Sequence, residues 1–263
     1  MVSAQHRRKI NRKLVGMNKT TLFLIALIAF LVFAITMTPA SLVYSSFQEK
    51  ISDGALDLAI SQVEGSIWQG QGNFHFRQFP VISGDWQLSP LYLLAATAHS
   101  SMTLKADGLT GVFDFSLSPW GGSINNLNAV VQNSYLNEIT IPYGLDLSGE
   151  VQLEKANLRF NQSWLTALEG ELHWNGGIVH IQTPEKIHTV NLPALDGRLS
   201  LEDANFKLDI KESGNSLLQI HIRPDGWVQV AINYAFMDLA NLPLPANARA
   251  GDDPAIVLEE KIL

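Results

Sequence analysis

The seven histidines are the residues best suited to chemistry in this chain, because imidazole binds metals and transfers protons near neutral pH. His173, His180 and His188 are spaced by seven and eight residues, and His173 and His180 are predicted on neighbouring strands. A metal site would need them to converge with a carboxylate such as Glu171 or Glu185, but no HExxH or comparable ligand spacing is present. The pattern favours surface or packed histidines, and we predict no metal site.

Covalent catalysis and cofactor binding also lack their sequence signatures. The chain has no cysteine, no GxSxG and no SxxK, and Gly70-x-Gly72 lacks the third glycine of a dinucleotide loop. The acidic pairs Asp252-Asp253 and Glu259-Glu260 lie in a polar tail, where solvation is their ordinary state. We therefore predict a non-catalytic protein without a cofactor.

The net charge of −7 divides unevenly along the chain. Residues 1–20 contain six cations and no acid, which leaves 12 cations against all 25 acids, a balance of −13, in the remainder. Such an acidic domain repels phosphate backbones, so the sequence argues against a nucleic-acid partner.

The first structural element predicted in the chain is a membrane segment. Thr21 to Met37 is a run of seventeen uncharged, mostly apolar residues, about 26 Å long as a helix, and Pro39 follows it. The preceding cations are expected to stay in the cytoplasm. We predict a cytoplasmic basic tail at 1–20, a single transmembrane signal anchor at 21–37 and a periplasmic remainder. A cleaved signal peptide is the alternative, because Thr38 and Ala40 resemble a cleavage site.

The remainder alternates with period two in many short runs that are separated by turn-forming pairs. This pattern predicts a mainly β protein, in which one large antiparallel, curved sheet or partly closed barrel occupies residues 38–242. Sandwich, half-barrel and small barrel all fit the alternation. Two hairpins are expected, one from 172 to 181 across Asn175-Gly176 and one from 220 to 232 across Asp225-Gly226.

Helical pattern is scarce. A short helix entered through Pro90 is expected at 91–98, and another could occupy 47–60, although the end of that range is more typical of a strand. Residues 243–263 are expected to form a loop with a last strand at 255–258.

A weak internal repeat relates Gly149 to Phe160, GEVQLEKANLRF, to Gly197 to Leu208, GRLSLEDANFKL, with five of twelve positions identical. The repeat suggests similar strands, each entered through a glycine. Coincidence among strand-rich segments is the alternative.

One segment is more specific than general strand pattern. Residues 63–70 read VEGSIWQG, and residues 84–94 read GDWQLSPLYLL. Together with the N-terminal anchor, and with the later blocks 147–151 and 168–177, they make the chain resemble the type II secretion system protein N family. The motif residues, expected to be structural, are Gly65, Trp68, Gly70, Trp86, Pro90, Leu94, Gly149, Gly170, Trp174 and Gly197.

The resemblance implies a bitopic inner-membrane component of the machinery that exports proteins across the outer membrane. Its partners would be the inner-membrane clamp protein and the outer-membrane secretin, contacted through sheet edges or exposed aromatic residues such as Trp120 and Tyr135. The alternative function is a periplasmic lipid-binding or lipid-bridging protein with one anchor, in which the apolar strand face would hold acyl chains.

Overall fold

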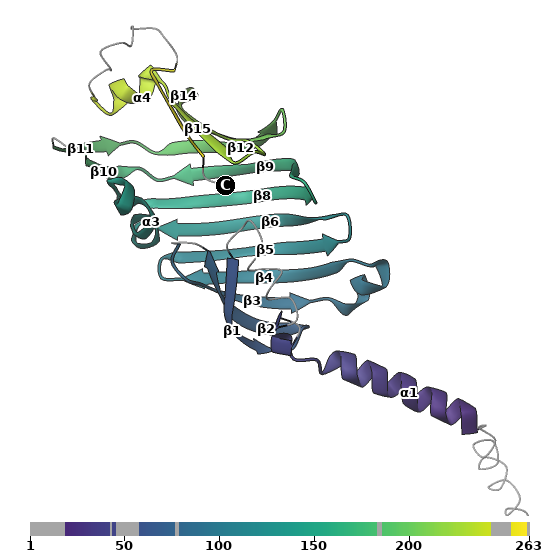
Figure 1. The fold of residues 1–263 in the computed structure, drawn as a ribbon. Helices are drawn as coiled ribbons and strands as arrows, with labels where there is room; N and C mark the ends of the chain where they lie inside the picture. The colour runs from purple at the N-terminus through teal and green to yellow at the C-terminus, as the bar shows by residue number, and fades with distance from the viewer. Residues whose placement is uncertain are drawn as a thin grey trace, which may run out of the picture.

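The computed structural model of the 263-residue chain describes residues 19–42, 44–45, 58–76, 79–182, 186–242 and 254–261. Within these residues, one antiparallel sheet of thirteen strands dominates the molecule (Figure 1). Its strands are β1 (Leu58–Gly65), β2 (Gln69–Phe76), β3 (Ile82–Leu88), β4 (Ala98–Ala106), β5 (Leu109–Ser118), β6 (Gly121–Gln132), β8 (Glu150–Asn161), β9 (Leu165–Trp174), β12 (Leu195–Glu202), β13 (Asn205–Glu212), β14 (Asn215–Ile222), β15 (Trp227–Ile232) and β16 (Ile256–Lys261).

The strands of this sheet lie beside one another in the order in which they occur in the chain. Most are joined by tight turns, as the alternation of apolar runs and Gly- or Asn-rich pairs predicts. The prediction of a mainly β protein with a large antiparallel sheet is confirmed. The described strands form an open sheet, with β1 at one edge and β16 at the other.

A smaller sheet and three short helical elements lie at one end of the strands, and a fourth helical element, which joins β3 to β4, lies at the opposite end (Figure 1). The small sheet has three strands in the order β11 (Ile187–Leu192), β10 (Gly177–Gln182), β7 (Leu145–Leu147). The helical elements are η1 (Pro90–Ala95), α3 (Asn133–Thr140), η2 (Ile141–Tyr143) and α4 (Tyr234–Leu239). The short helix that was expected after Pro90 is present as the 3₁₀ helix η1.

One predicted hairpin is correct and the other is wrong. β14 and β15 pair across the turn at Asp225-Gly226, with Ile222 opposite Val228. β9 and β10 do not form a hairpin, because β9 pairs with β8 and β12 while β10 pairs with β11 and β7. Gly176 has a φ of 82° and Gly177 a φ of 144°, and at this point the chain leaves the large sheet for the small one.

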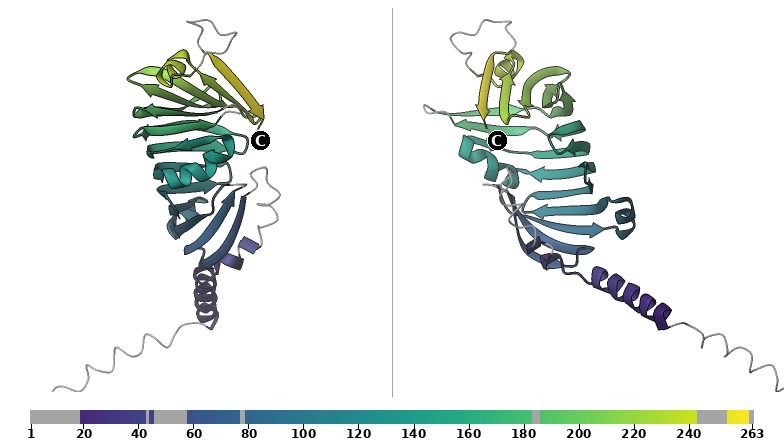
Figure 2. Two further views of the ribbon diagram at one scale, coloured as in Figure 1. Left: turned by 90° about the vertical axis from the view of Figure 1, so that its left-hand side faces the viewer. Right: turned by 45° about the vertical axis from the view of Figure 1, so that its right-hand side comes forward.

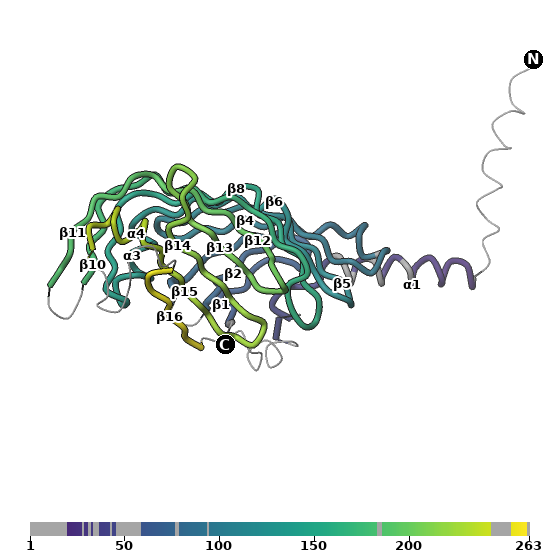
Figure 3. The backbone as a smooth tube through the Cα atoms, turned by 90° about the horizontal axis from the view of Figure 1, so that it is seen from above, coloured from purple at the N-terminus to yellow at the C-terminus, as the bar shows by residue number. Residues whose placement is uncertain are grey.

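The large sheet is strongly curved. Viewed along the stack of strands it forms an arch, and the strands of both sheet edges, β1 and β2 and also β15 and β16, lie on its inner side (Figure 3). The views in Figure 2 show a single layer of strands through the middle of the molecule. Two paired β-bulges contribute to the bend, with Asn126 in β6 and Lys155 in β8 at φ of 54° and 48°.

The sequence repeat does not correspond to a structural repeat. In the first copy, Lys155-Ala156 lies inside one continuous strand, β8, where Lys155 forms a bulge. In the second copy, Asp203-Ala204 forms the two-residue turn between β12 and β13, with φ of 49° and 63°. The same local pattern thus adopts left-handed backbone in both places, but neighbouring strands decide whether the chain continues or reverses.

The helix α1 (Lys19–Thr36) precedes the sheet and leads away from it (Figure 1). The chain after it is tied to the β1–β2 turn, because Pro39 pairs with Ser66 and the Ile67 N–H donates to the Thr38 carbonyl at 3.2 Å. Residues 46–57, where a second short helix was considered, lie outside the described residues. Over the part of the chain that is described, none of the helices reaches the combined length and hydropathy expected of a membrane span.

The buried core gathers at one end of the large sheet. It contains Trp174, Leu195 and Leu217, with Ala240 just after α4, and Val179, Val190 and Leu192 from β10 and β11. Among the described residues, Leu217 is the large side chain that is completely buried. The rest of the apolar sheet face is half-buried, so the tightly packed region is small compared with the sheet.

Candidate functional site

The first family motif forms a compact contact at the β1–β2 turn. Gly65 has a φ of 85° and begins the turn, and the Trp86 indole N–H donates to the Ser66 carbonyl at 3.3 Å. Gly70 lies opposite Trp86 in the β2–β3 register. A Cβ on Gly70 would lie 2.5 Å from Trp86 Cζ2, so glycine is needed where the indole covers the strand. Trp68 is the last residue of the same turn, and its carbonyl accepts the Leu88 N–H at 2.6 Å.

A second Gly–Trp pair has similar geometry 84 to 88 residues later in the sequence, since Gly149 corresponds to Gly65 and Trp174 to Trp86. Gly149 has a φ of 89°, and the Trp174 indole N–H donates to the neighbouring Ser148 carbonyl at 3.1 Å. A Cβ on Gly149 would lie 2.8 Å from the indole nitrogen. Trp174 is 7% exposed and anchors the buried core. In both pairs the indole nitrogen holds a carbonyl next to a left-handed glycine.

The remaining motif residues lie elsewhere on the sheet and around it. Pro90 begins η1, which also contains Leu94, whose side chain is outside the described residues. A Cβ on Gly170 would approach Ala156 to 2.8 Å, and one on Gly197 would approach Leu208 and Leu172 to 3.1 and 3.2 Å. These glycines therefore provide room for apolar neighbours on adjacent strands.

The glycines Gly70, Gly170 and Gly197 all belong to one apolar face of the large sheet. Strand alternation and register place facing residues on that face from β2 to β16. A central row crosses twelve strands through residues that are all apolar or glycine: Gly72, Gly84, Leu104, Gly111, Ala129, Leu153, Leu172, Gly197, Ile210, Leu218, Ile232 and Ile256. We call this surface the inner face.

The burial pattern assigns the inner face to the concave side of the arch. Its residues are more buried than their neighbours in sequence: Leu109 and Gly111 are buried, whereas Thr110 and Val112 are exposed. Curvature crowds the side chains on the inside of a sheet and separates those on the outside. Because the middle of the sheet is a single layer in Figures 1 and 2, curvature, and not a second described layer, accounts for this burial.

Aromatic rings cover several glycines of the inner face. Phe74 lies against Gly84, where a Cβ would come within 2.4 Å of its ring, and Phe160 lies against Gly122 at the same spacing. Together with Trp86 over Gly70, these rings lie close to the backbone of the adjacent strand. Large side chains that pack over glycine stabilise a sheet. Because they lie against the backbone, they project less far from the strands.

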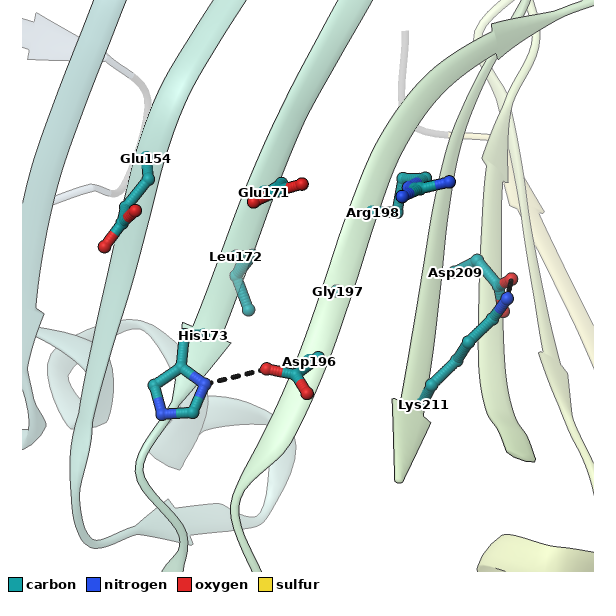
Figure 4. Close-up of a pocket in the computed structure, with 9 residues that line it drawn as sticks. All are labelled: Glu154, Glu171, Leu172, His173, Asp196, Gly197, Arg198, Asp209 and Lys211. Carbon is teal, nitrogen blue, oxygen red and sulfur yellow. Dashed lines mark hydrogen bonds and ion pairs between the residues drawn. The ribbon is translucent and has the colours of Figure 1, made fainter. Parts of the chain in front are cut away.

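The opposite face is polar, and one of its depressions is a pocket of about 410 Å³ (Figure 4). Glu154, Glu171, His173, Asp196, Arg198, Asp209 and Lys211 line it. His173 Nδ1 lies 2.8 Å from Asp196 Oδ1, and Lys211 Nζ lies 3.0 Å from Asp209 Oδ2. Arg198 lies between Glu171 and Asp209 on the neighbouring strands, so opposite charges face each other there, whereas Glu154 and Glu171 face each other as like charges.

The surroundings of Asp209 shift the pKa of its carboxyl group. Burial tends to raise this pKa, but hydrogen bonds from Ser216 and Lys211 and the charges of Lys211 and Lys207 outweigh it. The pKa therefore lies below its ordinary value, and the group is an ionised partner in a hydrogen-bonded cluster.

The histidines are distributed over separate strands. The prediction that His173 and His180 lie on neighbouring strands is wrong, because β9 and β10 belong to different sheets. His180 Nδ1 lies 3.0 Å from Thr189 Oγ1 in the small sheet. In the described part of the chain, no three His, Asp or Glu side chains converge as metal ligands.

The two aromatic residues considered as surface contacts differ from each other. Trp120, in the β5–β6 turn, is 76% exposed, whereas Tyr135 in α3 is buried at 6%. Burial and the nearby Glu138 raise the pKa of Tyr135. Tyr135 is thus a packing residue, and Trp120 remains available for contact.

Fold and surfaces define a class: an open, curved, single-layer antiparallel sheet with one apolar face and one polar face that carries paired charges. Comparison with protein families places the chain within this class more closely. Residues 57–256 match the type II secretion system (T2SS) protein N family, and the chain belongs to that family. No curated protein and no solved structure matches it. Membership makes the chain a component of type II secretion and associates it with the cell envelope.

Proposed function

We propose that the chain is a non-catalytic, membrane-anchored component of the type II secretion machinery that acts through protein contacts in the periplasm. The observation that carries this proposal is the family match, which covers β1 to the start of β16. The proposed arrangement is a cytoplasmic tail at 1–20, an inner-membrane anchor at 21–37 and a periplasmic sheet domain at 38–242, with β16 completing the sheet.

The anchor is proposed from the sequence. The run from Thr21 to Met37 contains no charge and would be about 26 Å long as a helix, close to the thickness of the hydrocarbon core of a bilayer. The six preceding cations favour a cytoplasmic N-terminus. We would replace residues 1–37 with a cleavable export signal and fractionate the cells. The sheet domain should move to the soluble periplasmic fraction, and retention in the membrane would contradict the anchor.

Partner contacts are proposed at the free edge of the sheet. Within the described strands, β16 pairs on one side with β15 and leaves its other edge open. Val257 is 47% and Leu258 57% exposed on this strand. An open edge with exposed apolar residues is suited to pairing with a strand of another chain. The secretin and the inner-membrane clamp protein are the proposed partners.

The absence of cysteine allows a sharp test. A single cysteine at Val257 is unique in the chain, and Val112, similarly exposed at 49% in the middle of the polar face, provides the matched control. Thiol cross-linking of the full-length protein in secreting cells should join Val257→Cys, but not Val112→Cys, to another secretion component. Equal yields from both positions, or no secretion component at either, would refute edge pairing.

A further inference from the structure

The inner face presents a hydrocarbon surface without a described covering layer. Its central row extends over twelve strands, about 53 Å at the usual strand spacing. Ser100 is the one polar residue among the buried residues in the described part, and its hydroxyl donates to the Ser101 carbonyl. A solvated apolar surface of this length is costly, so an apolar occupant would stabilise it.

The chain's own remaining segments are poorly suited to cover this face. The two longer stretches of the exported part outside the description, 46–57 and 243–253, contain four large apolar residues, Phe47, Ile51, Leu56 and Leu244, and seven charged ones. α1 is apolar but leads away from the sheet (Figures 1 and 2). The occupant must therefore come from outside the chain.

The shape of the face favours a thin occupant. β1 and β2 at one end and β15 and β16 at the other lie on the inner side of the arch (Figure 3), which restricts the approach of a second flat sheet. Face-to-face sheets need a separation of about 10 Å along their whole length. An acyl chain needs about half that depth and offers no polar groups that the face would have to satisfy.

The face also begins close to the predicted anchor. Thr38 and Pro39, two and three residues after α1, already bond to the β1–β2 turn. The first strands of the inner face therefore lie next to the residues that would leave the membrane. We infer that the inner face holds the acyl chains of diacyl glycerophospholipid, aligned along the central row and across the strands. This inference rests on the membrane anchor proposed above but not on the proposed partner contacts, which are tested separately.

Adjacent residues on one strand provide the test. The photoreactive residue p-benzoylphenylalanine would replace Leu153 on the inner face or Gln152 on the polar face of β8, in the full-length protein in cells grown with radiolabelled phosphate. A second pair is Phe113 and Val112 on β5, in which the polar-face residue is itself apolar and exposed. After irradiation, position 153 should carry several-fold more labelled lipid than 152, and 113 more than 112.

The adduct must also prove to be a glycerophospholipid. Phospholipase A digestion should remove an acyl chain from it, and mass spectrometry should show the corresponding loss. A phosphorylated amphiphile that resists the enzyme would overturn the assignment. Adducts to a protein or to a second copy of the chain, or no excess at the inner positions, would overturn it equally.

A substitution at Gly111 can obstruct the central row of the inner face without disturbing the fold. A Cβ at this position meets its nearest neighbour, Ala129 Cβ, at an ordinary 3.5 Å. Gly111→Phe should therefore fold and reduce the lipid adduct at position 153, two strands away in the central row. Thr110→Phe, exposed on the polar face of the same strand as Gly111, is the control that should leave the adduct unchanged. Equal yields in the two variants would contradict binding along the row.

Discussion

Asn128 and Asn157 lie diagonally across β6 and β8, on either side of the Leu127–Ala156 pair, and each side chain satisfies the bulge of the opposite strand. Asn157 Oδ1 accepts the Asn126 N–H at 2.9 Å, and Asn128 Oδ1 accepts the Lys155 N–H at 3.0 Å. Each amide nitrogen then donates to the carbonyl of its own bulge, at 2.8 and 3.0 Å. The two bulges thus form a reciprocal unit that fixes a bend in the middle of the sheet.

Removing either asparagine should destabilise the sheet. Asn157→Ala leaves the Asn126 N–H without its partner, and we expect a loss of about 1 kcal/mol in the free energy of unfolding. Asn128→Ala should cost a similar amount, and the double variant should cost less than their sum because both belong to one network. Urea unfolding in mild detergent measures these values.

The control for this prediction is Asn125→Ala. Its amide donates to the Ser123 hydroxyl and supports no bulge N–H. A loss as large as that of Asn157→Ala would show that the bulges are not held by their asparagines.

Replacing glycines of the inner face with alanine should change the stability of the protein by different amounts at different positions. Gly84→Ala places a Cβ against the Phe74 ring, and Phe74→Leu should restore much of the lost stability. Gly70→Ala also meets the Glu64 backbone carbonyl at 2.4 Å, so shortening Trp86 should not rescue it. Gly111→Ala should be neutral or stabilise by about 0.5–1 kcal/mol, because glycine weakens strands. Thermal unfolding of the five variants distinguishes these cases, and equal losses at all three glycines would contradict the contacts.

Asp209 should contribute stability that depends on pH. Its folded pKa lies below the unfolded value, so its contribution is present above about pH 4 and is lost as pH falls through the folded pKa. Asp209→Asn should therefore lower the melting temperature at pH 7, and the difference from wild type should shrink near pH 3. A difference that stays constant with pH would mean that packing, and not charge, accounts for the effect.

The Trp174 indole should contribute more to the free energy of unfolding than the packing of its apolar ring alone. Trp174→Phe keeps most of the packing but leaves the Ser148 carbonyl without its donor, and we expect a loss of about 1–2 kcal/mol. Trp164→Phe is the matched control, because its indole donates to the Ala204 carbonyl at an exposed turn. Differential scanning calorimetry should show a clearly smaller loss for Trp164→Phe.

Strand content and family could be predicted from the sequence because both depend on local pattern. Alternation identified β14 and β15, and the turn at Asp225-Gly226 joined them correctly. The same reasoning failed at Asn175-Gly176, because a turn-forming pair does not specify whether the next strand returns to the same sheet. The repeated LEKAN and LEDAN segments show a related limit, since register with neighbouring strands separates a bulge from a turn.

Period-two alternation predicts the apolar face of the sheet. It does not predict that this face has no covering layer among the described residues. Alternation is the same whether Leu153 faces a second sheet or the inside of an arch. The paired asparagines were also missed, because Asn128 and Asn157 become partners only through the β6–β8 register. Spacing of N-x-N and K-x-N on consecutive strands is the signal that could have indicated them.

The agreement between strand order and chain order has a consequence for how the protein is made. Nearly every strand pairs with one that was synthesised shortly before it, so the loops closed during folding are short. A chain that crosses a membrane in sequence order, beginning just after the proposed anchor, could then add strands one at a time to a growing edge. β16 would join last, and until then β15 would be the exposed edge on which misassembly or proteolysis acts.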